Sequence, residues 1–197
     1  LQQITVADDT KIKSNYLVTI TINAPPTISS TSAIVTAPVL ESLKLNLDAG
    51  DQASYSGSGT SWTDLSGNGK NATWQVSPTF TTEKGGSFTH AGATNQYATT
   101  PNLGTTDVLT VESWVKFNTL NIGNNYPCVI ADTWNGSLIN YSICFAGNNE
   151  IKGGYWRGSW TYTSGFTPVL GTWYHLVYTI SKSGSNYIST LYQNGNM

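Results

Sequence analysis

The chain has 197 residues, of which 39% are hydrophobic and only 10% are charged, and its formal net charge is −2. Soluble domains carry about 25% charged residues on average, so this surface relies on neutral Thr, Ser, Asn and Gly side chains. The absence of a basic run excludes an electrostatic footprint for nucleic acid. No apolar stretch reaches the roughly 18 residues that a membrane span needs, so we expect no membrane insertion.

The chain begins LQQITVADDT, which has neither an initiator Met nor the basic and apolar regions of a signal peptide. We therefore expect a processed chain or a fragment of a longer protein. Gly, Asn, Ser and Thr interrupt the sequence about every 8–12 residues, and the runs between them alternate in polarity. This pattern predicts an all-β fold, an antiparallel β-sandwich preceded by a short β-rich segment and a linker.

Residues 1–24 contain ITV and then YLVTITIN, the pattern of a half-buried strand. Pro25 and Pro26 end this strand, because proline cannot donate to a β-ladder. Residues 25–38 are polar, and we expect a linker there. Since 24 residues cannot bury a core alone, two interpretations stay open. The segment resembles the end of an immunoglobulin-like domain, or it is an assembly arm that adds a strand to a neighbouring subunit.

From residue 39 onward the β-pattern is dense. Alternating polarity predicts further strands at 43–47, 111–117, 173–180 and 187–192. Gly184 and Ser185 lie between the last two of these and predict a hairpin turn.

Asn135 and Gly136 are a second hairpin signal, between YPCVIAD and NYSICFA. Cys128 and Cys144 are equidistant from Gly136, so we expect them to face each other across this hairpin. Cross-strand neighbours have Cβ atoms about 4.5–5.5 Å apart, slightly farther than in a relaxed disulfide. The pair is either a disulfide or two small buried thiols, and we favour the thiols.

Four ordered segments resemble the concanavalin A-like lectin/glucanase superfamily, in its laminin-G-like jelly-roll branch. The most specific is WTDLSGNGKNAT at 62–73, which follows LKLNLDA; the others are GGSFTHAGATNQYATTPN, LTVESWVKFNT and GTWYHLVYTISKSGSNYISTLYQNGNM. The resemblance covers about residues 40–197 and implies a laminin-G-like jelly roll at 39–197. Members of the family usually continue past such an ending with further strands, so we expect the domain to be incomplete at its C-terminal end.

The resemblance also raises calcium as a cofactor, because calcium is frequent in this superfamily and binds six to eight oxygen ligands. Oxygen ligands would come from loops that meet at one rim: Asp48, Asp51, Asp64 and Asn68. Short polar side chains also bond their own backbone in tight turns. We favour the interpretation in which these four residues cap turns.

Catalysis is not expected. Glycosidases of this superfamily place two carboxylates on one strand, in a pattern like E-x-D-x-x-E, and a retaining mechanism needs them about 5 Å apart. None of the four glutamates, Glu41, Glu83, Glu112 and Glu150, stands in such a pattern. The two histidines, His90 and His175, accompany no nucleophile elbow.

Aromatic residues are the best indication of binding. The run YWRGSWTY at 155–162 places three rings on one face if it is a single unbroken strand. Sugars stack their C–H faces on such rings while polar groups orient them. The candidate carbohydrate-binding residues are Trp134, Trp156, Arg157, Trp160 and Tyr162. Core packing is the commoner role of an aromatic stripe, and it stays open as the alternative.

The segment LDAGDQASYSGSGTSWTDLSGNG also resembles jelly-roll modules appended to phage capsid, fibre and tail proteins. The resemblance implies a non-enzymatic structural, decoration or appendage domain on the virion surface of a tailed phage. Its partners would be other virion subunits, contacted through residues 1–24, and glycans of the host or the environment. Two alternatives remain open: a bacterial secreted or cell-surface adhesin module, and a carbohydrate-binding module of a larger enzyme.

Overall fold

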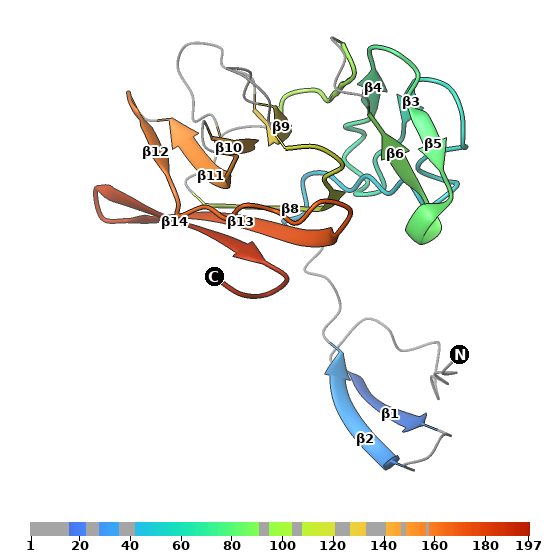
Figure 1. Cartoon of the computed structure of the whole chain (residues 1–197). Coiled ribbons are helices and arrows are strands. Elements are labelled where there is room, and N and C mark those ends of the chain that lie inside the picture. Colours follow the sequence, from blue (N-terminus) through green and yellow to red (C-terminus); the bar gives the residue numbers. More distant parts are fainter. Residues whose placement is uncertain are drawn as a thin grey trace. The chain divides into compact units, whose positions relative to one another are not determined.

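The strands in this computed structural model are antiparallel wherever they pair (Figure 1). The structure describes residues 16–22, 28–35, 42–90, 95–103, 108–120, 127–132, 141–146, 149–156 and 158–197. Among them the helical element is the 3₁₀ turn η1 (Glu83–Gly85). Described residues up to 90, with 95–101, form one compact unit, and those from 102 to 197 form a second. The prediction of a single laminin-G-like domain at 39–197 is not tested by this division.

The N-terminal segment forms a two-stranded ribbon. Strand β1 (Tyr16–Ile22) pairs with β2 (Ile28–Val35), in a register that runs from Tyr16 opposite Val35 to Ile22 opposite Ile28. The strand predicted from YLVTITIN is confirmed, whereas ITV lies outside the described residues. Strand β2 lies within the segment for which we predicted a linker, 25–38. Its run ISSTSAIV is rich in β-branched residues, which favour extended backbone once a neighbouring strand supplies a ladder.

The rest of the first unit holds short strands around an aromatic cluster. One sheet has the order β3-β4-β7 and a second pairs β5 with β6. The bounds are β3 (Ser61–Trp62), β4 (Ala72–Trp74), β5 (Thr79–Thr81), β6 (Ser87–Thr89) and β7 (Ala98–Thr99). The Phe88 ring meets the rings of Tyr55, Trp62 and Trp74 edge-on, with centroids 4.8 Å apart in each pair. Such edge-to-face contacts are favourable beyond the area that they bury.

The strand predicted at 43–47 is not formed. Residues 43–48 keep the expected alternation of burial, but no β-ladder is assigned to them. Their polar backbone groups are bonded by the loop at 62–73 instead. The Leu65 N–H donates to the Asn46 carbonyl at 2.8 Å, and the Asn46 N–H donates to Asp64 Oδ1 at 2.9 Å. The alternating polarity of residues 43–48 therefore predicted which side chains are covered, but it did not predict the hydrogen-bond partners of their backbone groups.

The second unit is a sandwich of two antiparallel sheets (Figure 1). A three-stranded sheet has the order β14-β13-β8, with bounds β8 (Leu109–Lys116), β13 (Trp173–Ser183) and β14 (Asn186–Gln193). A four-stranded sheet has the order β12-β11-β10-β9, with bounds β9 (Cys128–Ala131), β10 (Tyr141–Phe145), β11 (Ile151–Trp156) and β12 (Trp160–Tyr162). Three predicted strands and the turn at Gly184 and Ser185 are confirmed, since Ser183 pairs with Asn186.

The core of this unit lies between the two sheets. Alternate residues of each sheet point inward and are buried: Ile143, Phe145, Ile151 and Tyr155 from one, and Tyr174, Leu176, Tyr178, Ile180 and Leu191 from the other. Gly153 belongs to the same inward-facing row of β11. A Cβ atom at this position would collide with the Tyr178 ring. Glycine therefore lets a fully buried tyrosine of β13 lie directly against the β11 backbone.

A disulfide joins Cys128 to Cys144, with Cα atoms 3.9 Å apart. The preference for two buried thiols is therefore wrong, and Cys128 is also exposed. The register explains the close approach. Ile143 lies opposite Ile130, but Cys144 lies opposite Cys128, so Val129 is the extra residue of a β-bulge in β9. The predicted hairpin pairing is confirmed, while the turn residues Asn135 and Gly136 lie outside the described residues.

We expect the unreduced protein to lack the two thiol hydrogens by intact-mass measurement. The bridge closes a loop with a sequence separation of 16, which restricts the unfolded chain by about 3 kcal/mol. Replacing both residues, as Cys128→Ser with Cys144→Ser, should lower the free energy of unfolding by about that amount in urea. Reduced wild type is the matched control, and two titratable thiols in the native protein would contradict the assignment.

Candidate functional site

Three aromatic side chains gather on the outer face of the four-stranded sheet, and we call Trp156, Trp160 and Tyr162 the aromatic platform. Trp156 lies opposite Trp160 across β11 and β12, with ring centroids 5.8 Å apart and planes at 65°. Trp160 stacks on Tyr162, with centroids 5.6 Å apart and planes at 12°. Trp160 is 41% exposed and Tyr162 is 54% exposed. These two rings are therefore surface groups, which contradicts the core-packing alternative for them.

The platform forms by a different route from the predicted one. The run at 155–162 is not one strand: it turns back through Gly158, whose φ is +83°, and makes the β11–β12 hairpin. Directly paired residues of two strands share a face of the sheet, and so do alternate residues of one strand. The three rings consequently meet on one face although the strand is broken.

Gly154 positions the outer ring of the platform. It lies opposite Tyr162, and a Cβ atom at this position would come within 2.8 Å of the Tyr162 ring. The tyrosine ring therefore rests on bare backbone. Lys152 follows the same outward alternation on β11, and its Nζ forms an ion pair with Glu150 Oε2 at 3.0 Å. This neighbouring charge is thus compensated, which suits a site for a neutral ligand.

The other two candidate sugar-binding residues, Trp134 and Arg157, lie outside the described residues. The structure brings the remaining three together.

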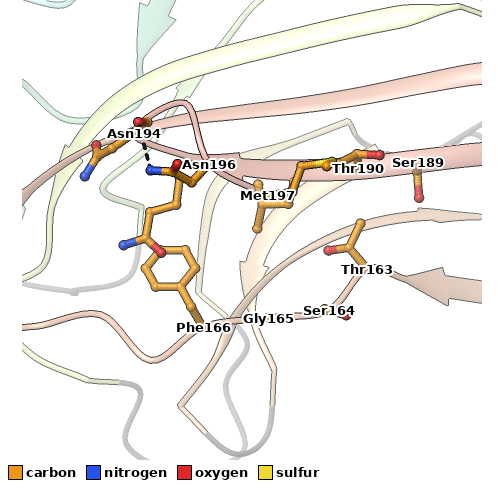
Figure 2. A pocket seen from close by; sticks show the side chains of 11 residues that line it. Thr163, Ser164, Gly165, Phe166, Ser189, Thr190, Asn194, Asn196 and Met197 are labelled. Atoms are coloured by element: carbon orange, nitrogen blue, oxygen red, sulfur yellow. Dashed lines mark hydrogen bonds between the residues drawn. The ribbon is translucent and has the colours of Figure 1, made fainter.

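A cavity of about 480 Å³ opens elsewhere in this unit, between the chain after β12 and the end of β14 (Figure 2). Its lining residues include no charged side chain: Thr163, Ser164, Gly165, Phe166, Ser189, Thr190, Leu191, Gln193, Asn194, Asn196 and Met197. General acid–base chemistry uses side chains such as His, Glu or Asp. The lining of this cavity offers hydrogen bonds without such groups.

Asp64 holds the loop at 62–73. It is only 7% exposed, and both of its carboxylate oxygens accept hydrogen bonds. Oδ1 accepts the N–H groups of Asn46 and Ser66, each at 2.9 Å. Oδ2 accepts the Lys70 N–H at 3.0 Å and the Ser66 hydroxyl at 2.8 Å. Burial raises the pKa of Asp64, but these hydrogen bonds outweigh burial, so its pKa lies below the ordinary value of 3.8.

The other candidate calcium ligands also bond to backbone groups. Asp48 Oδ1 accepts the Gly50 N–H at 2.8 Å, and Asp51 Oδ1 accepts the Ala53 N–H at 2.8 Å. Asn68 Nδ2 donates to the Leu43 carbonyl at 2.7 Å. Within the described ranges, no group of three or more His, Cys, Asp or Glu residues could hold a metal ion. These contacts are the ones that the turn-capping interpretation predicts.

We expect Asp64→Asn to lower the free energy of unfolding by about 2–3 kcal/mol at neutral pH. An amide has only one accepting oxygen, so its NH2 group would stand opposite the Lys70 N–H, where two donors meet without an acceptor. The lowered pKa has a second consequence. The contribution of Asp64 to stability is present above about pH 4 and is lost as the pH falls through the native pKa.

Urea unfolding between pH 2 and pH 7 measures both effects. Asp51→Asn is the matched control, since the bond from the Ala53 N–H to the Asp51 carboxylate lies at the exposed surface. Equal stability losses in the two variants, or an unaltered acid dependence in Asp64→Asn, would contradict the role of Asp64.

No helix among the described residues is long and apolar enough to cross a membrane.

The sequence model of the concanavalin A-like lectin/glucanases superfamily matches residues 91–197, which is more than half of the chain. The match includes both sheets of the second unit and begins after the WTDLSGNG segment. No curated protein and no solved structure gave a match. Membership in this superfamily suggests carbohydrate binding or a structural role. The chain belongs to the concanavalin A-like lectin/glucanase superfamily.

Proposed function

We propose that this chain is a non-enzymatic glycan-binding domain that uses the aromatic platform on β11 and β12. The observation that carries the proposal is that two stacked rings, Trp160 and Tyr162, are exposed on one face of the β11–β12 hairpin. Burial of apolar surface would otherwise draw such rings inward. A pyranose ring has an apolar C–H face that can cover these two rings. Neutral hydroxyl and amide side chains of the protein can form hydrogen bonds with the hydroxyl groups at the edge of the sugar.

Affinity at one such platform is modest, because a few ring contacts supply about 0.5–1.5 kcal/mol each beyond the area buried. Weak sites become effective when several copies are displayed together, since a second contact is then intramolecular. We therefore place the domain on a repetitive surface, as a decoration or appendage domain on the virion of a tailed phage. The low charge of the chain and its resemblance to phage-appended jelly rolls support this setting.

The partner subunits are proposed to contact the N-terminal segment. A two-stranded ribbon is at best marginally stable alone in water, and β1 and β2 pair only with each other among the described strands. Contact with a neighbouring subunit or domain would supply the missing burial. Because β2 pairs with β1, the contact surface comprises both strands and extends beyond the predicted residues 1–24.

Glycan-array binding and polysaccharide pull-down test the platform. Trp160→Ala and Tyr162→Ala should each weaken glycan binding at least about fivefold, which corresponds to roughly 1 kcal/mol of ring contact. Tyr97→Ala is the matched control, because Tyr97 is 50% exposed but belongs to the first unit. The proposal is refuted if broad arrays give no binding by the wild type, or if the platform variants bind as the wild type does.

Removal of residues 1–38 tests the assembly role. We expect the remaining chain to keep its urea midpoint, while light scattering shows loss of self-association or of binding to neighbouring subunits. The uncut chain at equal concentration is the control. Unchanged association would refute the ribbon as the contact surface.

A further inference from the structure

A second group of exposed polar and aromatic side chains lies on the outer face of the three-stranded sheet (Figure 1 shows β8 and β13). Trp114 of β8 is 66% exposed and lies opposite His175 of β13. Their rings stack with centroids 4.9 Å apart and planes at 22°. Glu112 shares the outward face of β8, and its Oε2 lies 3.3 Å from His175 Nε2. We call Glu112, Trp114 and His175 the β8–β13 cluster.

The cluster is held in place before any ligand arrives. The Glu112 carboxylate lies within hydrogen-bond distance of His175 Nε2, and it accepts this bond when Nε2 carries a proton. The backbone of His175 is bonded on both sides by one residue: its N–H donates to Asn194 Oδ1 at 2.9 Å, and its carbonyl accepts the Asn194 N–H at 2.9 Å. The imidazole therefore supports one side of the Trp114 indole and orients the Glu112 carboxylate beside it.

We propose that the β8–β13 cluster binds a ligand through an organic ammonium group. An indole face attracts cations because its π-system is negative above and below the ring. The Glu112 side chain is 69% exposed and brings a full negative charge to the same face. The alkyl carbons that flank the charged nitrogen of the ligand would pack against the exposed indole. The positive charge itself would be attracted by the carboxylate.

The sheet already contains contacts of this kind. Lys116 Nζ lies 5.4 Å from the centroid of the Trp173 ring, its cross-strand partner on the same outward face. Lys182 Nζ lies 5.9 Å from the Tyr187 ring. Ammonium groups thus lie over aromatic rings of this sheet without being deeply buried. Lys116 also limits the affinity, because its like charge is two positions from Trp114 on the same face. Lys116→Gln should therefore strengthen binding of a cation.

The ligand class differs from that of the aromatic platform, where the nearby charge is compensated and a neutral sugar fits. We assign the ammonium group to a glycan with unacetylated amino sugars, because membership in the superfamily suggests carbohydrate binding. A protein surface with lysine side chains carries the same chemical group. The closing experiment therefore includes a lysine arm whose outcome would contradict the glycan as the source.

The first measurement is an NMR titration of the ¹⁵N-labelled full chain with choline and with 3,3-dimethylbutan-1-ol, its neutral isostere. Choline should move the indole N–H signal of Trp114 and the amide signals near Glu112 and His175, with a dissociation constant in the millimolar range. Glu112→Gln should weaken choline binding about two- to fivefold, as expected for an exposed charge and ring. Trp114→Ala should abolish it, and Tyr97→Ala, at a ring that is 50% exposed in the first unit, should leave it unchanged.

The second measurement compares glucosamine oligomers with their N-acetylated forms, and a lysine peptide with its acetyl-lysine form. The glucosamine oligomers should bind, and N-acetylation should abolish their binding. Binding of the lysine peptide without binding of the glucosamine oligomers would contradict a glycan as the source. Equal shifts from choline and its neutral isostere would overturn the proposal. So would unaltered choline affinity in a Glu112→Gln variant whose amide spectrum otherwise matches the wild type.

Discussion

The backbone of β11 is held between two tyrosine rings, and the described second unit depends on this arrangement. Tyr178 approaches from the core at Gly153, and Tyr162 approaches from the outer face at Gly154. Two consecutive glycines allow both approaches, because either Cβ atom would collide with a ring. The inner contact sets how closely the two sheets pack at this point. The outer contact places Tyr162 beside Trp160, so sheet packing and the aromatic platform share one strand.

Polar side chains have a comparable structural role in the first unit. Residues 43–48 lack a ladder, and the Asp64 carboxylate and the Leu65 N–H bond their backbone groups instead. Hydrogen bonds to a charged acceptor are stronger than neutral ones, so one buried carboxylate can organise a loop of Gly and Asn. A calcium ion is a common means of neutralising such a carboxylate in proteins. Here backbone N–H groups and a serine hydroxyl surround it.

The two sheets of the second unit present chemically different outer faces. The four-stranded sheet carries stacked rings beside a compensated ion pair, which favours a neutral sugar. The three-stranded sheet carries an exposed indole beside a carboxylate, which favours a cation. The two groups of residues belong to different sheets. Superfamily membership suggests carbohydrate binding or a structural role. The two faces lead to two separate chemical proposals, a neutral sugar on one and a cation on the other.

The sequence by itself determined the β class, the superfamily and the strands with strict alternation, such as β8, β13 and β14. It also located the Gly184 turn, because alternation and turn chemistry are local properties of the chain. Tertiary structure alone decided which backbone groups pair. It left residues 43–48 without a ladder, broke 155–162 into a hairpin, and used a bulge at Val129 to bring Cys128 to Cys144. It likewise brought His175 beside Trp114, 61 positions earlier in the chain. Register between distant strands depends on packing of the whole sheet, which no local pattern encodes.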